Sequence, residues 1–264
     1  MTTRVHLART PGPGPGAEPG HFAGRLDRLD ALRGLAMVWM MAFHLVFDLN
    51  FLGLLQPRQN FYADPLWTGQ RTAIVSLFLL CAGLGQAVVA QRGRGWPRFW
   101  RRWAQVAGCA VLVSVGSALM FPNSWISFGV LHGMAVMLLL TRFLQPLGPW
   151  LWPLGALLLM LPTWLAHPLF DQPWLQWVGL VTRKPVTEDY VPVLPWLGVM
   201  LLGQAVGQRL LRRRSTLLGA GLPAVAAPLW RGLAGLGRWP LTVYMLHQPL
   251  FLGLLLAWQR LGRG

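Results

Sequence analysis

The sequence predicts an all-α membrane protein, a polytopic bundle of about seven transmembrane helices with its N-terminus in the cytoplasm. Of 264 residues, 54% are hydrophobic and 12% are charged, whereas about 25% of the residues in an ordinary soluble chain are charged. The mean hydropathy is +0.45, and the apolar residues form long runs. This composition excludes an ordinary soluble domain and predicts an integral membrane protein.

Seven apolar runs are long enough to cross a hydrocarbon core of about 30 Å, which requires roughly 17 to 25 helical residues. In chain order they are Leu32 to Leu55, Thr72 to Ala90, Ala104 to Met120, Ile126 to Thr141, Trp150 to Leu165, Val193 to Leu210, and Leu241 to Trp258. A further apolar segment, Leu217 to Leu229, is short and contains Pro223 and Pro228. We expect that segment to lie at the interface or against the bundle.

The chain divides into a tail and one domain. Residues 1–24, which include PGPGPGAEPG, predict a flexible N-terminal tail because they carry too little apolar surface to offset the cost of ordering. Residues 25–264 form the predicted transmembrane domain. No cleaved signal peptide is expected, since the first apolar run is long and is interrupted by His44 and Asp48.

The basic residues predict the orientation of the bundle. The chain has 23 Lys and Arg against 8 Asp and Glu, a formal net charge of +15. With a cytoplasmic N-terminus, 17 of the basic residues lie inside and 6 outside, which satisfies the positive-inside rule. Basic residues beside membrane spans predict contact with anionic lipids of the bilayer, and no nucleic acid partner is expected. The single Lys among them indicates a GC-rich genome and favours a bacterial inner membrane.

Polar residues follow one face of the first predicted span. Arg33 and His44 are eleven positions apart, which returns to within about 20° of the same face, about 16 Å further along a helix. Asp30 lies one turn before Arg33, and Asp48 one turn after His44. Because ionisable groups are costly at membrane depth, this stripe indicates a functional site. The structural alternative is an amphipathic helix that turns its polar groups into the bundle.

Two histidines in later spans are candidates to join this stripe. His132 lies about six residues into the fourth predicted span, where a structural histidine bonded to a neighbouring helix is an equal alternative. His247 and Gln248 precede Pro249, which removes a backbone donor and frees a carbonyl. Such a kink is tolerated beside protein or a wet cavity, although a plainly packed proline kink is the alternative.

An acidic segment precedes the sixth predicted span. In TEDYV, Glu188, Asp189 and Tyr190 stand at its outer mouth, where they could bind a polar acceptor, although acidic pairs in loops are often only solvated. Cys81 and Cys109 fall within predicted spans without metal-ligand spacing, so no metal is expected.

Five sequence blocks resemble a known family when taken in order. They are DALRGLAMVWMMAFH, SLFLLCAGLG, ISFGVLHGMAV, DYVPVLPWLGVMLLG and LGRWPLTVYMLHQP. They resemble small bacterial membrane proteins that are grouped with the catalytic domain of heparan-alpha-glucosaminide N-acetyltransferase. Arg33 and His44, with ten residues between them, are also similar to the R-x10-H signature of the acyltransferase-3 proteins, which acylate surface polysaccharides. The resemblance implies a transmembrane acyltransferase-like domain over residues 25–264.

The resemblance implies acetyl-CoA as a donor from the cytoplasm and a sugar amine or hydroxyl on the far side as acceptor. Arg33 then suits a donor phosphate or carbonyl, and His44 can take a proton from the acceptor. The candidate catalytic residues are His44, Asp48, His132 and His247; the candidate donor contacts are Arg33, Asp30 and Arg28; the candidate acceptor contacts are Asp189, Tyr190 and Gln248. We expect Asp48 to orient the His44 imidazole. Direct transfer and an acetylated histidine are both open.

The sequence differs from the lysosomal enzyme of this family at a position that bears on the acceptor. The lysosomal enzyme has a functional histidine in the loop after its first helix, whereas this chain has none near the matching position, Tyr62. Heparan glucosamine itself is therefore not the expected acceptor, and an envelope glycan, a lipid-linked sugar and another class of acceptor all stay open. Transport through the intramembrane His and Asp groups is the alternative function, and a membrane subunit without chemistry is a third. A homo-oligomer is compatible with the sequence.

Overall fold

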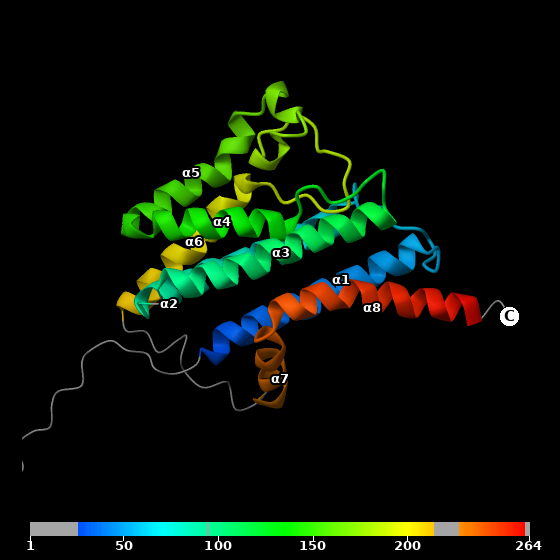
Figure 1. Ribbon diagram of the computed structural model, residues 1–264, viewed down its shortest axis with the longest axis horizontal. Coiled ribbons are helices and arrows are strands. Elements are labelled where there is room, and N and C mark those ends of the chain that lie inside the picture. The colour runs from blue at the N-terminus through cyan, green and yellow to red at the C-terminus, as the bar shows by residue number, and fades with distance from the viewer. Residues whose placement is uncertain (1–25, 94, 214–226, 262–264) are drawn as a thin grey trace, which may run out of the picture.

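The computed structural model describes residues 26–93, 95–213 and 227–261 (Figure 1). The predicted tail over residues 1–24 lies outside the described residues, as does most of the predicted interfacial segment 217–229. Throughout the described ranges the regular structure is helical, with one isolated bridge between Phe128 and Tyr190. The predicted all-α fold class is therefore confirmed.

Each of the seven predicted spans overlaps one α-helix. The helices are α1 (Asp27–Phe51), α2 (Pro65–Gln91), α3 (Trp96–Met120), α4 (Val130–Leu144), α5 (Leu151–Trp164), α6 (Val193–Arg212), α7 (Ala227–Gly237) and α8 (Pro240–Leu261), with the short 3₁₀ helices η1 (Gln145–Trp150), η2 (Pro168–Asp171) and η3 (Gln176–Val178). Several begin earlier than the apolar runs do. Helix α2, for example, starts at Pro65 because the Asp64 side chain accepts a hydrogen bond from the Leu66 amide at 2.8 Å and caps the first turn.

The predicted count of seven spans is not confirmed. Within the described residues, five segments are long and apolar enough to cross a membrane: α1, α2, α3, residues 130–164, and α8. Helices α4 and α5 have 15 and 14 residues, about 22 and 21 Å at 1.5 Å per residue, so neither alone matches the bilayer core. Gly148 separates them with a φ of +57°, a left-handed conformation that glycine tolerates. Helix α6 is not among these five segments, because Gln and Arg residues in its second half lower its mean hydropathy.

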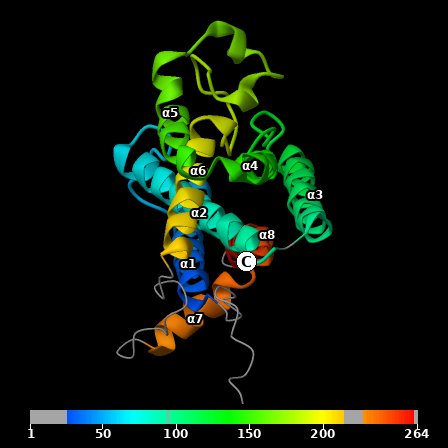
Figure 2. The ribbon, with the colours of Figure 1, turned by 90° about the vertical axis from the view of Figure 1, so that its left-hand side faces the viewer.

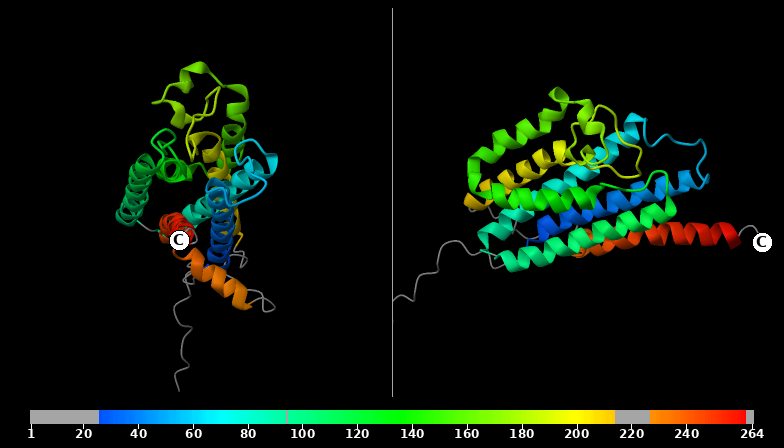
Figure 3. Two further views of the ribbon diagram at one scale, coloured as in Figure 1. Left: turned by 90° about the vertical axis from the view of Figure 1, so that its right-hand side faces the viewer. Right: turned by 45° about the horizontal axis from the view of Figure 1, so that its top comes forward.

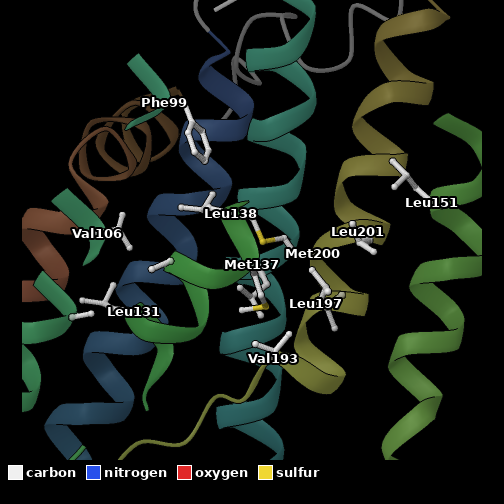
Figure 4. Close-up of a cluster of buried hydrophobic side chains, with 14 of the residues drawn as sticks. Phe99, Val106, Leu131, Met137, Leu138, Leu151, Val193, Leu197, Met200 and Leu201 are labelled. Atoms are coloured by element: carbon white, nitrogen blue, oxygen red, sulfur yellow. The ribbon is translucent and has the colours of Figure 1, made fainter. Parts of the chain in front are cut away.

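Helix α6 packs between α2 and α5 in the interior of the bundle (Figure 2). A Cβ on Gly83 of α2 would overlap the Met200 carbonyl, and one on Gly203 of α6 would approach the Leu80 carbonyl, so glycine permits this close contact. Figure 4 shows the apolar side chains that fill the space around it. The polar Gln204 is accommodated there because its Nε2 donates to the Thr141 carbonyl at 3.1 Å.

Helices α7 and α8 complete the bundle beside α1. A Cβ on Gly34 of α1 would overlap the Leu233 carbonyl of α7, and one on Gly237 would overlap the Asp30 carbonyl, so α7 crosses α1 at very short range. Helix α8 then runs along α1 in the opposite half of the bundle from α5 (Figure 1). Helix α7 begins within the last three residues of the predicted interfacial segment 217–229 and continues beyond it to Gly237.

Candidate active site

A cavity of about 1060 Å³ lies among helices α1, α2, α3, α4 and α8. The starts of α1, α3 and α8 and the end of α2 lie at one end of the bundle (Figure 1). Side chains along almost the full length of these helices line the cavity, so it extends from one end of the bundle towards the other. We name its two ends after Arg33 and Glu188.

The Arg33 end is basic. Four guanidinium groups line it: Arg33 of α1, Arg98 and Arg102 of α3, and Arg238 between α7 and α8. Arg33 Nη1 donates to Asp30 Oδ1 at 3.1 Å, and Nη2 donates to the Cys81 carbonyl at 3.4 Å. A Cβ on Gly85 of α2 would lie 2.6 Å from Arg33 Nη2. Gly85 therefore leaves the space that the guanidinium occupies.

Two histidines meet in the middle of the cavity wall. His44 Nδ1 of α1 lies 2.6 Å from His247 Nε2 of α8, and His247 Nδ1 lies 2.7 Å from the Tyr244 carbonyl. A carbonyl only accepts hydrogen bonds, so His247 carries its proton on Nδ1, and its Nε2 then accepts from His44 Nδ1–H. In the neutral pair this network assigns a lone pair to His44 Nε2. No hydrogen bond from a described residue occupies that nitrogen.

Asp48 contacts Gln248 and not His44, contrary to the expected orienting role. Gln248 Nε2 donates to Asp48 Oδ1 at 2.7 Å, and the Asp48 side chain is buried, with 1% of its surface exposed. Helix α8 supplies the partners of both α1 residues, because His247 and Gln248 are adjacent. Gln248 lines the cavity, whereas Asp48, its hydrogen-bond partner, does not.

The Glu188 end holds both carboxylates and cations. Tyr62 Oη and Ser124 Oγ donate to Glu188 at 2.7 and 2.5 Å, and the Val130 amide donates to Asp189 Oδ2 at 2.7 Å. Arg71 lines the same end.

Burial sets the pKa direction for two charged groups at the Glu188 end. Burial raises the pKa of Asp189, against the opposing effects of its amide hydrogen bond and of Arg71. Burial also lowers the pKa of Lys184, and repulsion from Arg71 adds to that shift. Both directions reflect the cost of holding a charge away from water.

Besides Asp48, three predicted site residues lie outside the cavity lining. His132 accepts from the Gly129 amide at 3.3 Å and contacts Ser114 Oγ at 3.1 Å, so it caps α4 and ties α4 to α3, the structural alternative left open by the sequence. Tyr190 Oη donates to the Gln176 carbonyl at 2.7 Å. Arg28 is close to the basic end in sequence but does not contribute to the lining.

Several cavity residues were not singled out as site residues from the sequence. They are Tyr62, Arg71, Gln86, Arg98 and Arg238. Arg71 and Gln86 belong to α2 and share its cavity face with apolar residues such as Phe78 and Ala82. Such a mixed face gives no clear signal in the sequence. In the described ranges, no group of three or more His, Cys, Asp or Glu side chains forms a metal-binding cluster.

Comparison with known proteins assigns the family. Residues 25–249 match the family model described as heparan-alpha-glucosaminide N-acetyltransferase, catalytic. No curated protein and no solved structure matches the chain. The family match covers most of the chain, including Arg33, His44 and His247. The chain therefore belongs to the family of heparan-alpha-glucosaminide N-acetyltransferase catalytic domains.

Proposed function

We propose that this protein is a bacterial inner-membrane acetyltransferase. It takes the acetyl group of acetyl-CoA at the cytoplasmic face and transfers it to a sugar hydroxyl or amine at the opposite face. One observation carries the proposal: a single cavity connects four arginines, an unoccupied histidine nitrogen and a carboxylate-lined end. A donor that cannot cross the bilayer has to reach its acceptor through such a cavity.

The arrangement of basic residues supports a cytoplasmic Arg33 end. The last turns of α4 and α6 and the first turns of α3 carry Arg142, Arg209, Arg212, Arg98, Arg101 and Arg102. These helix ends lie on the same side of the bundle (Figure 1), as the positive-inside rule requires of a cytoplasmic side. The Glu188 end then faces the acceptor.

The residues at the Arg33 end fit the donor. Guanidinium groups bind phosphates through paired, charge-assisted hydrogen bonds, and the donor carries phosphates. Gln86 follows Gly85 on α2 and also lines the cavity. Its Oε1 is buried and has no hydrogen-bond partner among the described residues. An amide N–H of the donor's pantetheine arm would satisfy that oxygen.

His44 supplies the general base in this mechanism. As the acceptor oxygen or nitrogen bonds to the acetyl carbon, His44 Nε2 takes the acceptor proton and the carbon–sulfur bond breaks. His44 then returns the proton to the departing thiolate, so the histidine ends as it began. Because donor and acceptor ends belong to one cavity, we propose direct transfer without an acetylated histidine.

His247 acts as a positioning residue. Its Nε2 accepts from His44 Nδ1 and so keeps the His44 lone pair on Nε2, and the same bond favours the imidazolium that forms during transfer. We expect His247→Leu to lower kcat about 100-fold with little change in donor KM. His247→Gln, whose amide oxygen can accept the same bond, should restore part of the rate. Steady-state kinetics in nanodiscs measures both, and an equal loss in the two variants would contradict this role.

A sided assay distinguishes acetyl transfer from transport. The protein is reconstituted into sealed vesicles with radiolabelled acetyl-CoA outside. Only protein molecules whose Arg33 end faces outward can bind this acetyl-CoA. Acetylated sugar inside, dependent on His44, supports transfer between the two faces. Uptake of solute that needs no acetyl-CoA would support the transport alternative, which the family match does not favour.

A further inference from the structure

The cavity has a lateral opening between α3 and α8. On α3, Leu112, Gly116 and Met120 follow one another at every fourth position, line the cavity, and are exposed. On α8, Pro249 and Gly253 do the same, as does Leu256 one turn later. Figures 2 and 3 show α3 and α8 as neighbours with no other helix between them.

Both edges of the opening include a glycine with open space beside it. A Cβ on Gly116 or on Gly253 would meet no atom within 4 Å. Leu112 and Met120 expose 63% and 52% of their surface. Because α3 and α8 are both candidate membrane spans, this opening faces lipid chains rather than water. It lies in the halves of the two helices nearer the Glu188 end.

Two cationic side chains, Arg71 and Lys184, lie at the Glu188 end of the cavity. Arg71 and Tyr62 line the cavity. Lys184 lies outside the lining, with its Nζ 5.6 Å from the centre of the Tyr62 ring. The carboxylates of Glu188 and Asp189 accept hydrogen bonds from hydroxyl and amide groups. Both cations act electrostatically on Asp189, but among the described residues no ion pair within 4.0 Å joins Arg71 or Lys184 to either carboxylate, so each cation can still form a direct ion pair with an anion.

We propose that the acceptor is a sugar attached through phosphate to a membrane lipid, which enters the cavity sideways between α3 and α8. Its apolar chain lies between Gly116 and Gly253, and its phosphate lies beside Arg71 and Lys184. The sugar then extends towards His44. This inference rests on the proposed acetyl transfer, and it names the acceptor class. A water-soluble glycan would need neither an apolar opening within the membrane nor cations beside it.

Photocrosslinking tests the binding site without requiring turnover. The probe is a hexosamine linked through phosphate to an isoprenoid chain that bears a diazirine, in nanodiscs of neutral phospholipid. We expect saturable labelling of residues 112–120 and 249–256. The unlabelled lipid should remove the labelling, and the same lipid without its phosphate should compete about tenfold less well. Labelling spread over all lipid-facing helices, or equal competition by the neutral lipid, would overturn the proposal.

Tryptophan substitutions block the opening selectively. Gly116→Trp and Gly253→Trp should each lower the specific labelling about tenfold or more. Gly108→Trp is the matched control, because Gly108 is an open glycine of α3 that does not line the cavity. Unchanged labelling in both blocking variants would overturn the proposed route.

Donor binding distinguishes the two levels of proposal. The blocking variants should bind acetyl-CoA with wild-type affinity, since neither glycine lies at the Arg33 end. Specific lipid labelling in a protein that binds no acetyl-CoA would contradict the proposed acetyl transfer and leave the lipid site intact. Acetyl-CoA binding together with unspecific lipid labelling would leave the transferase and overturn the lipid acceptor.

Discussion

Replacing His44 with alanine should abolish acetyl transfer and leave acetyl-CoA binding unchanged. Because His44 Nδ1–H donates to His247, the basic lone pair of His44 is on Nε2. Loss of a general base typically lowers kcat about 10²- to 10⁴-fold. The donor phosphates are expected far from this position, at the Arg33 end. Transfer rates and equilibrium donor binding, both measured in nanodiscs, test the two halves of the expectation.

His167→Ala is the matched control for the His44 variant. His167 lies in the loop before η2, where its Nδ1 accepts from the Leu169 amide at 3.1 Å, and it does not line the cavity. Its loss should leave transfer near the wild-type rate. Full activity in His44→Ala, or an equal decrease in donor affinity, would contradict the assignment of His44 as base.

Replacing Arg33 with alanine should weaken donor binding about 10- to 100-fold. Hydrogen bonds to charged groups contribute about 1.5 to 3 kcal/mol, and each 1.4 kcal/mol is about a factor of ten in affinity. Equilibrium binding of acetyl-CoA to the purified variant measures the change. Removal of the CoA phosphates from the ligand should reduce the difference between wild type and variant.

Gly85 offers a test of Arg33 geometry that keeps its charge. Gly85→Ala places a methyl group where the Arg33 guanidinium now lies, so we expect weaker donor binding with all arginines present. Gly108→Ala is the control on α3, where a Cβ meets nothing within 4 Å. Unchanged affinity in both Arg33→Ala and Gly85→Ala would contradict a donor role for the Arg33 end.

The pattern on α1 could be predicted because a helix relates residues along one chain. The eleven-residue spacing places Arg33 and His44 on one face, and both line the cavity. The partner of His44 could not be predicted in this way. His247 is 203 positions away, and only the packing of α8 against α1 decides that His247 meets His44 while Gln248 takes Asp48.

The same distinction applies to the fold. Apolar runs are sufficient to predict where the long helices lie, because membrane helices need continuous hydrophobic residues. The apolar runs alone do not distinguish a full membrane span from the shorter helices α4 and α5. The turn at Gly148, which separates these two helices, is a local backbone feature that hydropathy does not show. The Glu188 end is assembled from three loops and the start of α2, and no periodic pattern joins Tyr62, Ser124 and Glu188.

Equilibrium binding of radiolabelled acetyl-CoA to the purified wild-type protein in nanodiscs tests the central claim most directly. We predict saturable binding that unlabelled CoA displaces, because the Arg33 end recognises phosphates. Absence of binding by a folded, monodisperse protein would contradict an acetyl-CoA-dependent transferase and would favour the transport alternative.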